Sequence, residues 1–171
     1  MKSVFIGTRL EALKELVLKT KVIKVITKKG SFVDKFADKN KLSISYINKK
    51  NKFKIFNYIK VLDVNLVFSA GFPYKIPKKF FDLKKIYINS HPSLLPKYKG
   101  LRPVRDALKN NEKEIGITVH FMSEKLDDGK IIKQKKMIIK EKQDINSIYK
   151  VLFSIKEPQT IKTALNILIN K

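Results

Sequence analysis

Asn89-Ser90-His91-Pro92-Ser93-Leu94-Leu95-Pro96 is the segment that decides the fold, and it follows the short apolar run Ile86-Tyr87-Ile88. The apolar run predicts a buried β-strand, and the prolines fix φ and remove backbone donors in the loop after it. Residues two apart in an extended segment point to the same side. We therefore expect Asn89 and His91 to face one reacting atom from the end of a strand.

Short apolar segments alternate with helical patterns on the N-terminal side of this segment. The pattern predicts helices at 11–18, 32–38 (after the start signal Gly30-Ser31) and 52–60, and strands at 4–6, 22–26, 42–46, 66–68 and 86–88. Alternation of this kind is typical of βαβ units. It indicates an α/β fold with a mostly parallel sheet flanked by helices.

The C-terminal half has a different pattern. A helix is predicted at 105–110, followed by strands at 115–121 and 131–139 with no helix between them. Two consecutive strands without a crossover favour an antiparallel pair. The tail from Ile145 to Ile169 is predicted to be helical and broken near Pro158, because proline interrupts a helix interior.

Length and composition restrict the class of protein. The 171 residues, 43% of them hydrophobic, fit one domain with a substantial core. No apolar run is long enough to span a bilayer, and the N-terminal apolar run is too short for a secretory signal, so we expect a cytoplasmic protein. With no cysteine and only two histidines, we expect neither a disulfide framework nor a metal site.

The formal charge of +23 raises the question of a polyanionic partner. Only three of the 38 basic residues are arginines, namely Arg9, Arg102 and Arg105, although arginine is the better ligand for phosphate and base edges. The lysines are spread through every segment. We therefore interpret the charge chiefly as a general lysine bias, although the positive field would attract phosphorylated substrates.

A second motif, Leu126-Asp127-Asp128-Gly129, places two carboxylates in a turn-prone context. Taken with residues 89–96, its order and spacing resemble the signature of folate-dependent formyltransferases, a family that includes glycinamide ribonucleotide, methionyl-tRNA and sugar N-formyltransferases. The resemblance implies a Rossmann-like formyltransferase fold with a twisted sheet. It further implies a single catalytic domain over 1–171, with no additional C-terminal domain.

The resemblance assigns the catalytic roles to Asn89, His91 and Asp127. In the family, the amide and the imidazole stabilise an oxyanion. The carboxylate raises the histidine pKa, orients the ring and accepts the amine proton through a water. Asp128 replaces a glycine common in the family and would strain the loop if its position needs a positive φ. His120, in a predicted strand, is interpreted as structural.

The resemblance also implies a site for the co-substrate 10-formyltetrahydrofolate, with no metal. Folate-binding residues would lie after the strand at 66–68 and in the loop before Asp127: Phe72, Tyr74, Ile76, Ser123, Lys125 and Leu126. Phe72, Tyr74 and Ile76 are equally well interpreted as ordinary core and loop residues. The acceptor-binding candidates, Thr8, Arg9 and Glu157, rest on a weaker match.

The implied function is transfer of a formyl group to a primary amine, preferably a small phosphorylated amine of the glycinamide ribonucleotide type. The partners are then small-molecule folate and amine substrates, with no membrane. An amino-sugar nucleotide is the second candidate acceptor. Initiator tRNA is possible but not favoured, because a tRNA-binding domain is not evident. A catalytically inactive relative that binds folate or nucleic acid is the non-enzyme alternative.

Overall fold

The computed structural model describes residues 1–77, 79, 81, 84–140 and 143–170. The chain forms two compact units, Met1–Ile88 and Asn89–Lys171. The strands are ordered β3-β2-β1-β4-β5-β6-β7 in a seven-stranded sheet. The predicted α/β fold with an antiparallel pair in its C-terminal half is confirmed. The predicted single-domain organisation stays a prediction.

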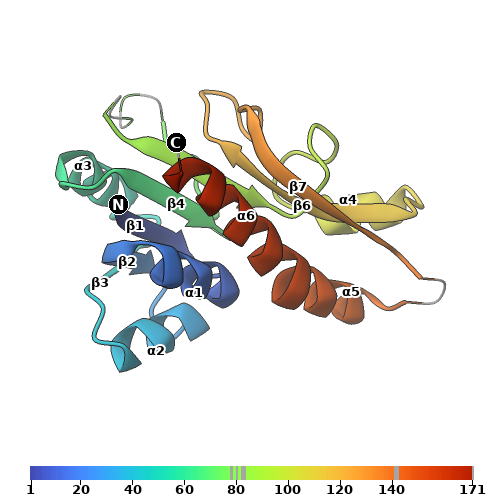
Figure 1. Cartoon of the computed structure of the whole chain (residues 1–171), viewed down its shortest axis with the longest axis horizontal. Helices are drawn as coiled ribbons and strands as arrows, with labels where there is room; N and C mark the ends of the chain where they lie inside the picture. The colour runs from blue at the N-terminus through green and yellow to red at the C-terminus, as the bar shows by residue number, and fades with distance from the viewer. Residues whose placement is uncertain (78, 80, 82–83, 141–142, 171) are drawn as a thin grey trace. The chain divides into compact units, whose positions relative to one another are not determined.

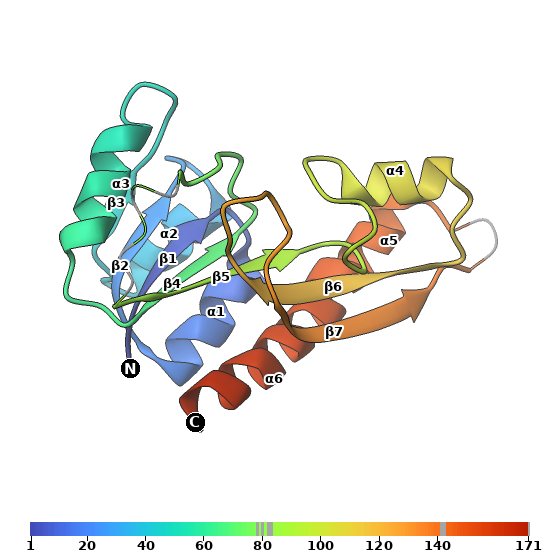
Figure 2. The same cartoon turned by 90° about the horizontal axis from the view of Figure 1, so that it is seen from above.

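The first unit contains the βαβ part of the fold. Its elements are β1 (Lys2–Gly7), α1 (Leu10–Lys19), β2 (Lys21–Thr27), α2 (Phe32–Lys39), β3 (Ile44–Tyr46), α3 (Lys52–Val61) and β4 (Leu66–Ala70). β1 pairs in parallel with both β2 and β4, and β2 pairs in parallel with β3. Within this unit, α1 and α2 lie on one side of the strands and α3 on the other (Figures 1 and 2).

The core of this unit explains its sequence pattern. Three consecutive residues of β1, Val4, Phe5 and Ile6, are fully buried. Unbroken burial is expected for a parallel strand that is covered by helices on both faces. The Phe5 and Phe68 rings meet edge to face, with centroids 6.1 Å apart, and so join β1 to β4.

Local signals set the ends of these elements. Ser31 begins α2 as predicted, and its hydroxyl accepts the Asp34 N–H at 3.1 Å. β3 is shorter than predicted because the Leu42 N–H bonds to the Ala37 carbonyl, which closes the end of α2. Gly7 ends β1 so close to β4 that a Cβ would lie 1.9 Å from the Ala70 carbonyl oxygen. That approach brings the loops after β1 and β4 together.

The second unit contains α4 (Pro103–Lys109), β6 (Glu114–Phe121), β7 (Ile131–Ile138), α5 (Ile145–Val151), the π-helix η2 (Leu152–Lys156) and α6 (Glu157–Ile169). β5 (Ile86–His91) begins in the first unit and ends here. β6 and β7 pair antiparallel, and α6 packs along them (Figure 2). The buried core of this unit draws on both strands, α4, α5 and η2: Val104, Ala107, Ile115, Ile117, Met137, Ile148 and Leu152.

The predicted break near Pro158 is wrong. Helical structure continues without interruption through α5, η2 and α6, and Pro158 lies in the first turn of α6. The Glu157 N–H just before it bonds to the Leu152 carbonyl across a wide π-helical turn, and this irregular hydrogen-bonding pattern accommodates a residue that has no N–H to donate. The chain passes into α6 through a π-helical turn, a local adjustment that such transitions permit.

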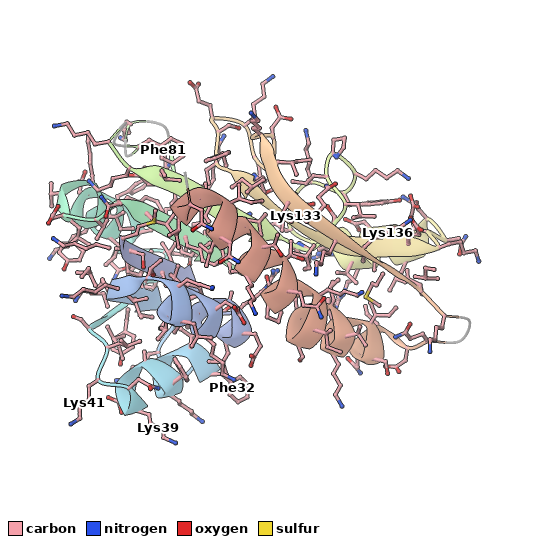
Figure 3. All side chains as sticks on the ribbon, in the orientation of Figure 1. Phe32, Lys39, Lys41, Phe81, Lys133 and Lys136 are labelled. Atoms are coloured by element: carbon pink, nitrogen blue, oxygen red, sulfur yellow. The ribbon has the colours of Figure 1, made fainter. Side chains whose placement is uncertain are left out.

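The basic side chains are spread over different elements. Figure 3 labels Lys39 and Lys41 at the end of α2, and Lys133 and Lys136 on β7. The positive charge is therefore not confined to one strand or helix. Across the described part of the chain, no helix has both the length and the apolar character required to cross a membrane.

Candidate active site

Three side chains of the second unit meet around the carboxylate of Asp127. Its Oδ1 lies 3.4 Å from Asn89 Nδ2 and 3.6 Å from His120 Nε2. Its Oδ2 lies 3.4 Å from His91 Nδ1. Asn89 and His91 are two apart in β5, so the predicted convergence of the amide and the imidazole on one side of a strand is confirmed, and the later carboxylate joins them.

The hydrogen bonds of His91 determine which of its ring nitrogens carries a proton. Nε2 lies 2.8 Å from the Tyr98 carbonyl oxygen, which can only accept, so Nε2 donates. Nδ1 then faces a carboxylate. A bare nitrogen lone pair would repel that oxygen, whereas N–H would bond to it. The contacts therefore suit an imidazolium that can both donate and release a proton.

His120 fixes the orientation of the Asn89 amide. His120 Nδ1 donates to the Phe121 carbonyl oxygen at 2.8 Å, which leaves Nε2 of the neutral ring as an acceptor. Asn89 Nδ2 lies 3.3 Å from that nitrogen. An amide oxygen at this position would face two acceptors, so the nitrogen belongs there. Both contacts of Nδ2 are long and therefore weak, and an incoming negatively charged oxygen can replace one of them.

The side chains of the site are shielded from water, which strengthens the interactions between their charges. Asp127, His91 and His120 are buried, and Asn89 is half-buried. Burial acts to raise the pKa of Asp127. The contact with the His120 ring, the charge of His91 and the Gly100 N–H together outweigh burial, so the pKa of this carboxyl lies below its usual range. Asp127 is therefore an ionised acceptor at neutral pH.

Three consecutive residues, Tyr98 to Gly100, hold the site in place from one side. The Tyr98 carbonyl accepts from His91, and the Gly100 N–H donates to Asp127 Oδ2 at 2.9 Å. The Lys99 ammonium pairs with Asp128 and lowers the pKa of that carboxyl. Asp128 thus points toward Lys99, outside the Asp127 cluster, and links its own loop to residues 98–100.

Backbone constraints fix the loop that carries Asp127. Asp127 itself has φ of +51°, in the left-handed region, so the positive φ belongs to Asp127 and Asp128 needs none. Such a conformation costs free energy at a non-glycine residue and persists where surrounding contacts hold it. The base of the loop is closed by the Phe121 N–H, which donates to the Lys130 carbonyl at 2.9 Å.

Gly129 allows the closest approach in this loop. A Cβ at this position would lie 1.7 Å from the Phe121 carbonyl oxygen. We expect Gly129→Ala to shift the loop, to lower the free energy of unfolding by about 1–3 kcal/mol, and to change the NMR signals of the His91 imidazole. Urea denaturation and side-chain NMR measure the two effects. The control is Gly30→Ala, where φ of +77° strains an alanine but its Cβ would meet nothing within 4 Å, so this variant measures backbone strain without a clash. Unchanged His91 signals in Gly129→Ala would contradict the prediction.

The lowered pKa of Asp127 predicts a pH dependence of stability. Its folded pKa lies below the unfolded value of about 3.9, so ionised Asp127 adds to the free energy of unfolding above that pH. The contribution is lost as the pH falls through the folded pKa. We expect the stability difference between the native chain and Asp127→Asn to shrink on acidification below about pH 4. Denaturant titrations at several pH values measure it, and a constant difference would contradict the assignment.

A second contact holds β5 from its other face. Ser90 lies between Asn89 and His91, and its hydroxyl donates to Glu157 Oε1 at 2.6 Å. Both residues are buried. Glu157 was predicted to bind the acceptor, and its carboxylate is here directed at the strand that carries the amide and the imidazole. Since the Ser90 side chain points opposite to its neighbours, β5 is bonded on both faces.

The predicted residues of the first unit lie after β1 and β4. The Thr8 hydroxyl donates to the Gly71 carbonyl at 3.0 Å, and Arg9 stands at the start of α1. The Phe72 and Tyr74 rings pack edge to face at 5.3 Å, while Ile76 is buried. Thr8 and Arg9 thus adjoin the segment of Phe72, Tyr74 and Ile76. Their roles in ligand binding stay predictions.

The predicted folate-binding residues of the second unit lie in the loop between β6 and β7. The Ser123 hydroxyl donates to the Lys125 carbonyl at 3.0 Å and forms a tight turn. Lys125 and Leu126 are exposed immediately before Asp127. They are accessible to a ligand beside the carboxylate, although binding at these residues stays a prediction.

Interpreting His120 as merely structural missed its contacts with Asn89 and Asp127. The structure shows why these contacts form. Thr118 and His120 lie on the same face of β6 by strand alternation, and the Thr118 hydroxyl donates to the Ser93 carbonyl at 2.6 Å. That face therefore looks toward the segment after β5. The sequence alone does not show that the two segments are neighbours.

Comparison with known proteins adds to this geometry. The family described as formyl transferase matches residues 2–165. The chain is 35% identical over 123 residues to the bifunctional polymyxin resistance protein ArnA of Wigglesworthia glossinidia brevipalpis. The aligned region is 71% of this chain and 19% of that protein. It is 35% identical over 117 residues to the methionyl-tRNA formyltransferase of Pelagibacter ubique, covering 68% of this chain and 38% of the relative.

A solved structure resembles the whole chain. The phosphoribosylglycinamide formyltransferase of Anaplasma phagocytophilum superposes with a TM-score of 0.84 at 26% identity, covering 99% of this chain and 86% of that one. The curated relatives are much longer, since the chain spans 19% and 38% of their lengths. The fold is therefore shared along nearly the entire chain, whereas the curated relatives share only part of their length with it.

Proposed function

Because the chain belongs to the formyl transferase family, we propose that it transfers a formyl group from 10-formyltetrahydrofolate to a primary amine. The observation that carries the proposal is that Asn89 Nδ2 and His91 Nδ1 each lie 3.4 Å from a carboxylate oxygen of Asp127. These groups supply a neutral N–H donor, a cationic donor and an anionic acceptor. Transfer of an acyl group to an amine needs each of them.

The reaction moves one carbon between two nitrogens. The new bond joins the acceptor nitrogen to the formyl carbon, and the bond from that carbon to the folate nitrogen breaks. As the acceptor adds, negative charge grows on the formyl oxygen. Asn89 Nδ2 and the His91 imidazolium are the donors that stabilise it, and they act strongly because the site is buried.

Asp127 manages the proton. The acceptor nitrogen loses one proton and the folate nitrogen gains one, so the reaction needs no net acid or base. The lowered pKa of Asp127 keeps it ionised, and a water beside it carries the amine proton. His120 contacts both Asn89 and Asp127 and so positions these two side chains.

The acceptor we propose is a small phosphorylated amine of the glycinamide ribonucleotide type, in the cytoplasm. It is supported by a solved phosphoribosylglycinamide formyltransferase that matches 99% of this chain. The similarity to ArnA supports an amino-sugar nucleotide as the second candidate. The similarity to a methionyl-tRNA formyltransferase supports initiator tRNA as the third, and binding to tRNA should then weaken steeply with salt.

Turnover of the formyl donor with a panel of amines tests the proposal. The panel contains glycinamide ribonucleotide, an amino-sugar nucleotide and charged initiator tRNA. We expect donor consumption with one of them, and a loss of at least about a hundredfold in His91→Ala. Formyl transfer would be refuted if the native protein and His91→Ala consumed the donor equally, or if neither protein consumed it with any of the three amines. The identity of the active amine decides among the three acceptors.

A further inference from the structure

A pocket of about 270 Å³ opens within the first unit, where four parallel strands end. Its lining follows β1, β2, β3 and β4 in turn: Gly7, Thr8, Thr27, Lys28, Ile47, Asn48, Phe72, Pro73 and Tyr74. Ligands of open α/β sheets bind at the carboxyl ends of strands. The volume is near the lower limit for ligand pockets, so it suits one ring system with a short polar extension.

The segment after β4 gives the pocket an aromatic wall. The Phe72 and Tyr74 rings meet at 81°, and Phe56 supports Phe72 from α3 with ring centroids 6.1 Å apart. Pro73 completes this wall, and the buried Ile47 adds apolar surface from the segment after β3. Aromatic surface of this kind binds a planar heteroaromatic ring by stacking on one ring and edge contacts with the other.

The segment after β3 is held rigid. Asn48 Oδ1 accepts the N–H groups of Lys50 at 2.8 Å and Asn51 at 3.0 Å. Asn51 Oδ1 accepts the Asn48 N–H at 2.8 Å, and its amide donates to the Tyr46 carbonyl. Because the Asn48 oxygen is bound to the backbone, its amide nitrogen is the part that can donate to a ligand. A preformed wall lowers the entropic cost of binding.

The polar groups of the pocket favour a ring that carries N–H donors and an anion. The Thr8 hydroxyl donates to the Gly71 carbonyl, so its oxygen remains as an acceptor. The Thr27 hydroxyl donates to the Gly7 carbonyl, and its oxygen already lies 3.1 Å from the Ser31 hydroxyl. Lys28 lines the pocket with an exposed side chain, where an ammonium group attracts a phosphate. Aromatic wall, acceptor oxygen, one amide donor and one cation together match a nucleotide.

We propose that this pocket binds a mononucleotide, with its base against Phe72 and Tyr74 and its phosphate at Lys28. The inference rests in part on the proposed function, because Thr8, Phe72 and Tyr74 of the lining are also predicted acceptor- and folate-binding residues. Such a nucleotide has two sources. It is either the nucleotide end of an amino-sugar nucleotide acceptor or a separate effector, and both present the same base and phosphate.

Saturation-transfer NMR on the full chain tests the proposal with uridine and adenosine 5′-monophosphates and the two nucleosides. We expect base protons to receive saturation. Lys28→Ala should weaken nucleotide binding about tenfold and leave nucleoside binding unchanged. Asn48→Ala should weaken both about fivefold. The matched control is Lys49→Ala, an exposed lysine outside the lining, which should change neither.

Absence of transfer to any nucleotide at millimolar concentration would overturn the proposal, and so would binding that Lys28→Ala leaves intact. The proposal would also be refuted if a reduced folate bound here in a way that depends on Lys28 while no nucleotide bound, because the pocket would then be a folate site. If the monophosphate competes with the amine in donor turnover, it is part of the acceptor; if it changes the rate without competing, it is an effector. Binding without any turnover would leave the pocket standing and the transfer reaction refuted.

Discussion

Replacing Asp127 by asparagine is expected to lower kcat for formyl transfer by about a thousandfold. The substitution keeps the size of the side chain but removes the negative charge that faces His91 and His120. An amide cannot take the amine proton, and its nitrogen would compete with the imidazole as a donor. The loss should fall on kcat more than on KM, which steady-state kinetics at saturating donor resolve.

The adjacent carboxylate provides the control for this prediction. Asp128 is exposed and pairs with Lys99, and surface ion pairs contribute little. Asp128→Asn should change kcat by less than about threefold. If Asp127→Asn retains activity to within about tenfold of the native protein, Asp127 does not handle the proton. Melting temperatures of both variants show whether the loss reflects chemistry or unfolding.

Asn89→Ala is expected to lower kcat by a few hundredfold, or about 10²–10³. The amide is the neutral donor of the site, and alanine leaves the charge on the formyl oxygen to the imidazole alone. Donor and acceptor KM should change less than kcat, because the contact strengthens as the negative charge develops.

Stability separates this effect from simple misfolding. Asn89 Nδ2 makes only long contacts, at 3.3 and 3.4 Å, so its loss should cost about 1 kcal/mol in the free energy of unfolding. Asn166→Ala, at an exposed position of α6, is the matched control and should leave kcat unchanged. Equal loss of stability and activity in Asn89→Ala would indicate a structural role.

Regular patterns in the sequence were sufficient to predict most of the fold. The buried runs of β1 and β4 and the helical spacing of α1 reflect local geometry that each segment carries by itself. The convergence of Asn89 and His91 follows from the two-residue repeat of a strand. Residues whose conformation depends on near neighbours were therefore predictable.

Features that depend on distant neighbours were not. His120 joins the site because β6 brings it to Asn89, and nothing in its own segment indicates that contact. Tyr98 and Gly100 act through a main-chain carbonyl and a main-chain N–H, groups that every sequence offers. The left-handed backbone of Asp127 arises from the contacts around it, so it has no signature in the four residues of its motif.

Bonding on both faces of β5 has a consequence for how the reaction begins. With Ser90 bound to Glu157 on one face and the neighbours of Ser90 facing Asp127 on the other, the strand cannot roll about its axis without breaking hydrogen bonds on both sides. The donors consequently stand ready before any substrate arrives, and the freedom they would otherwise lose at each turnover has already been given up in folding.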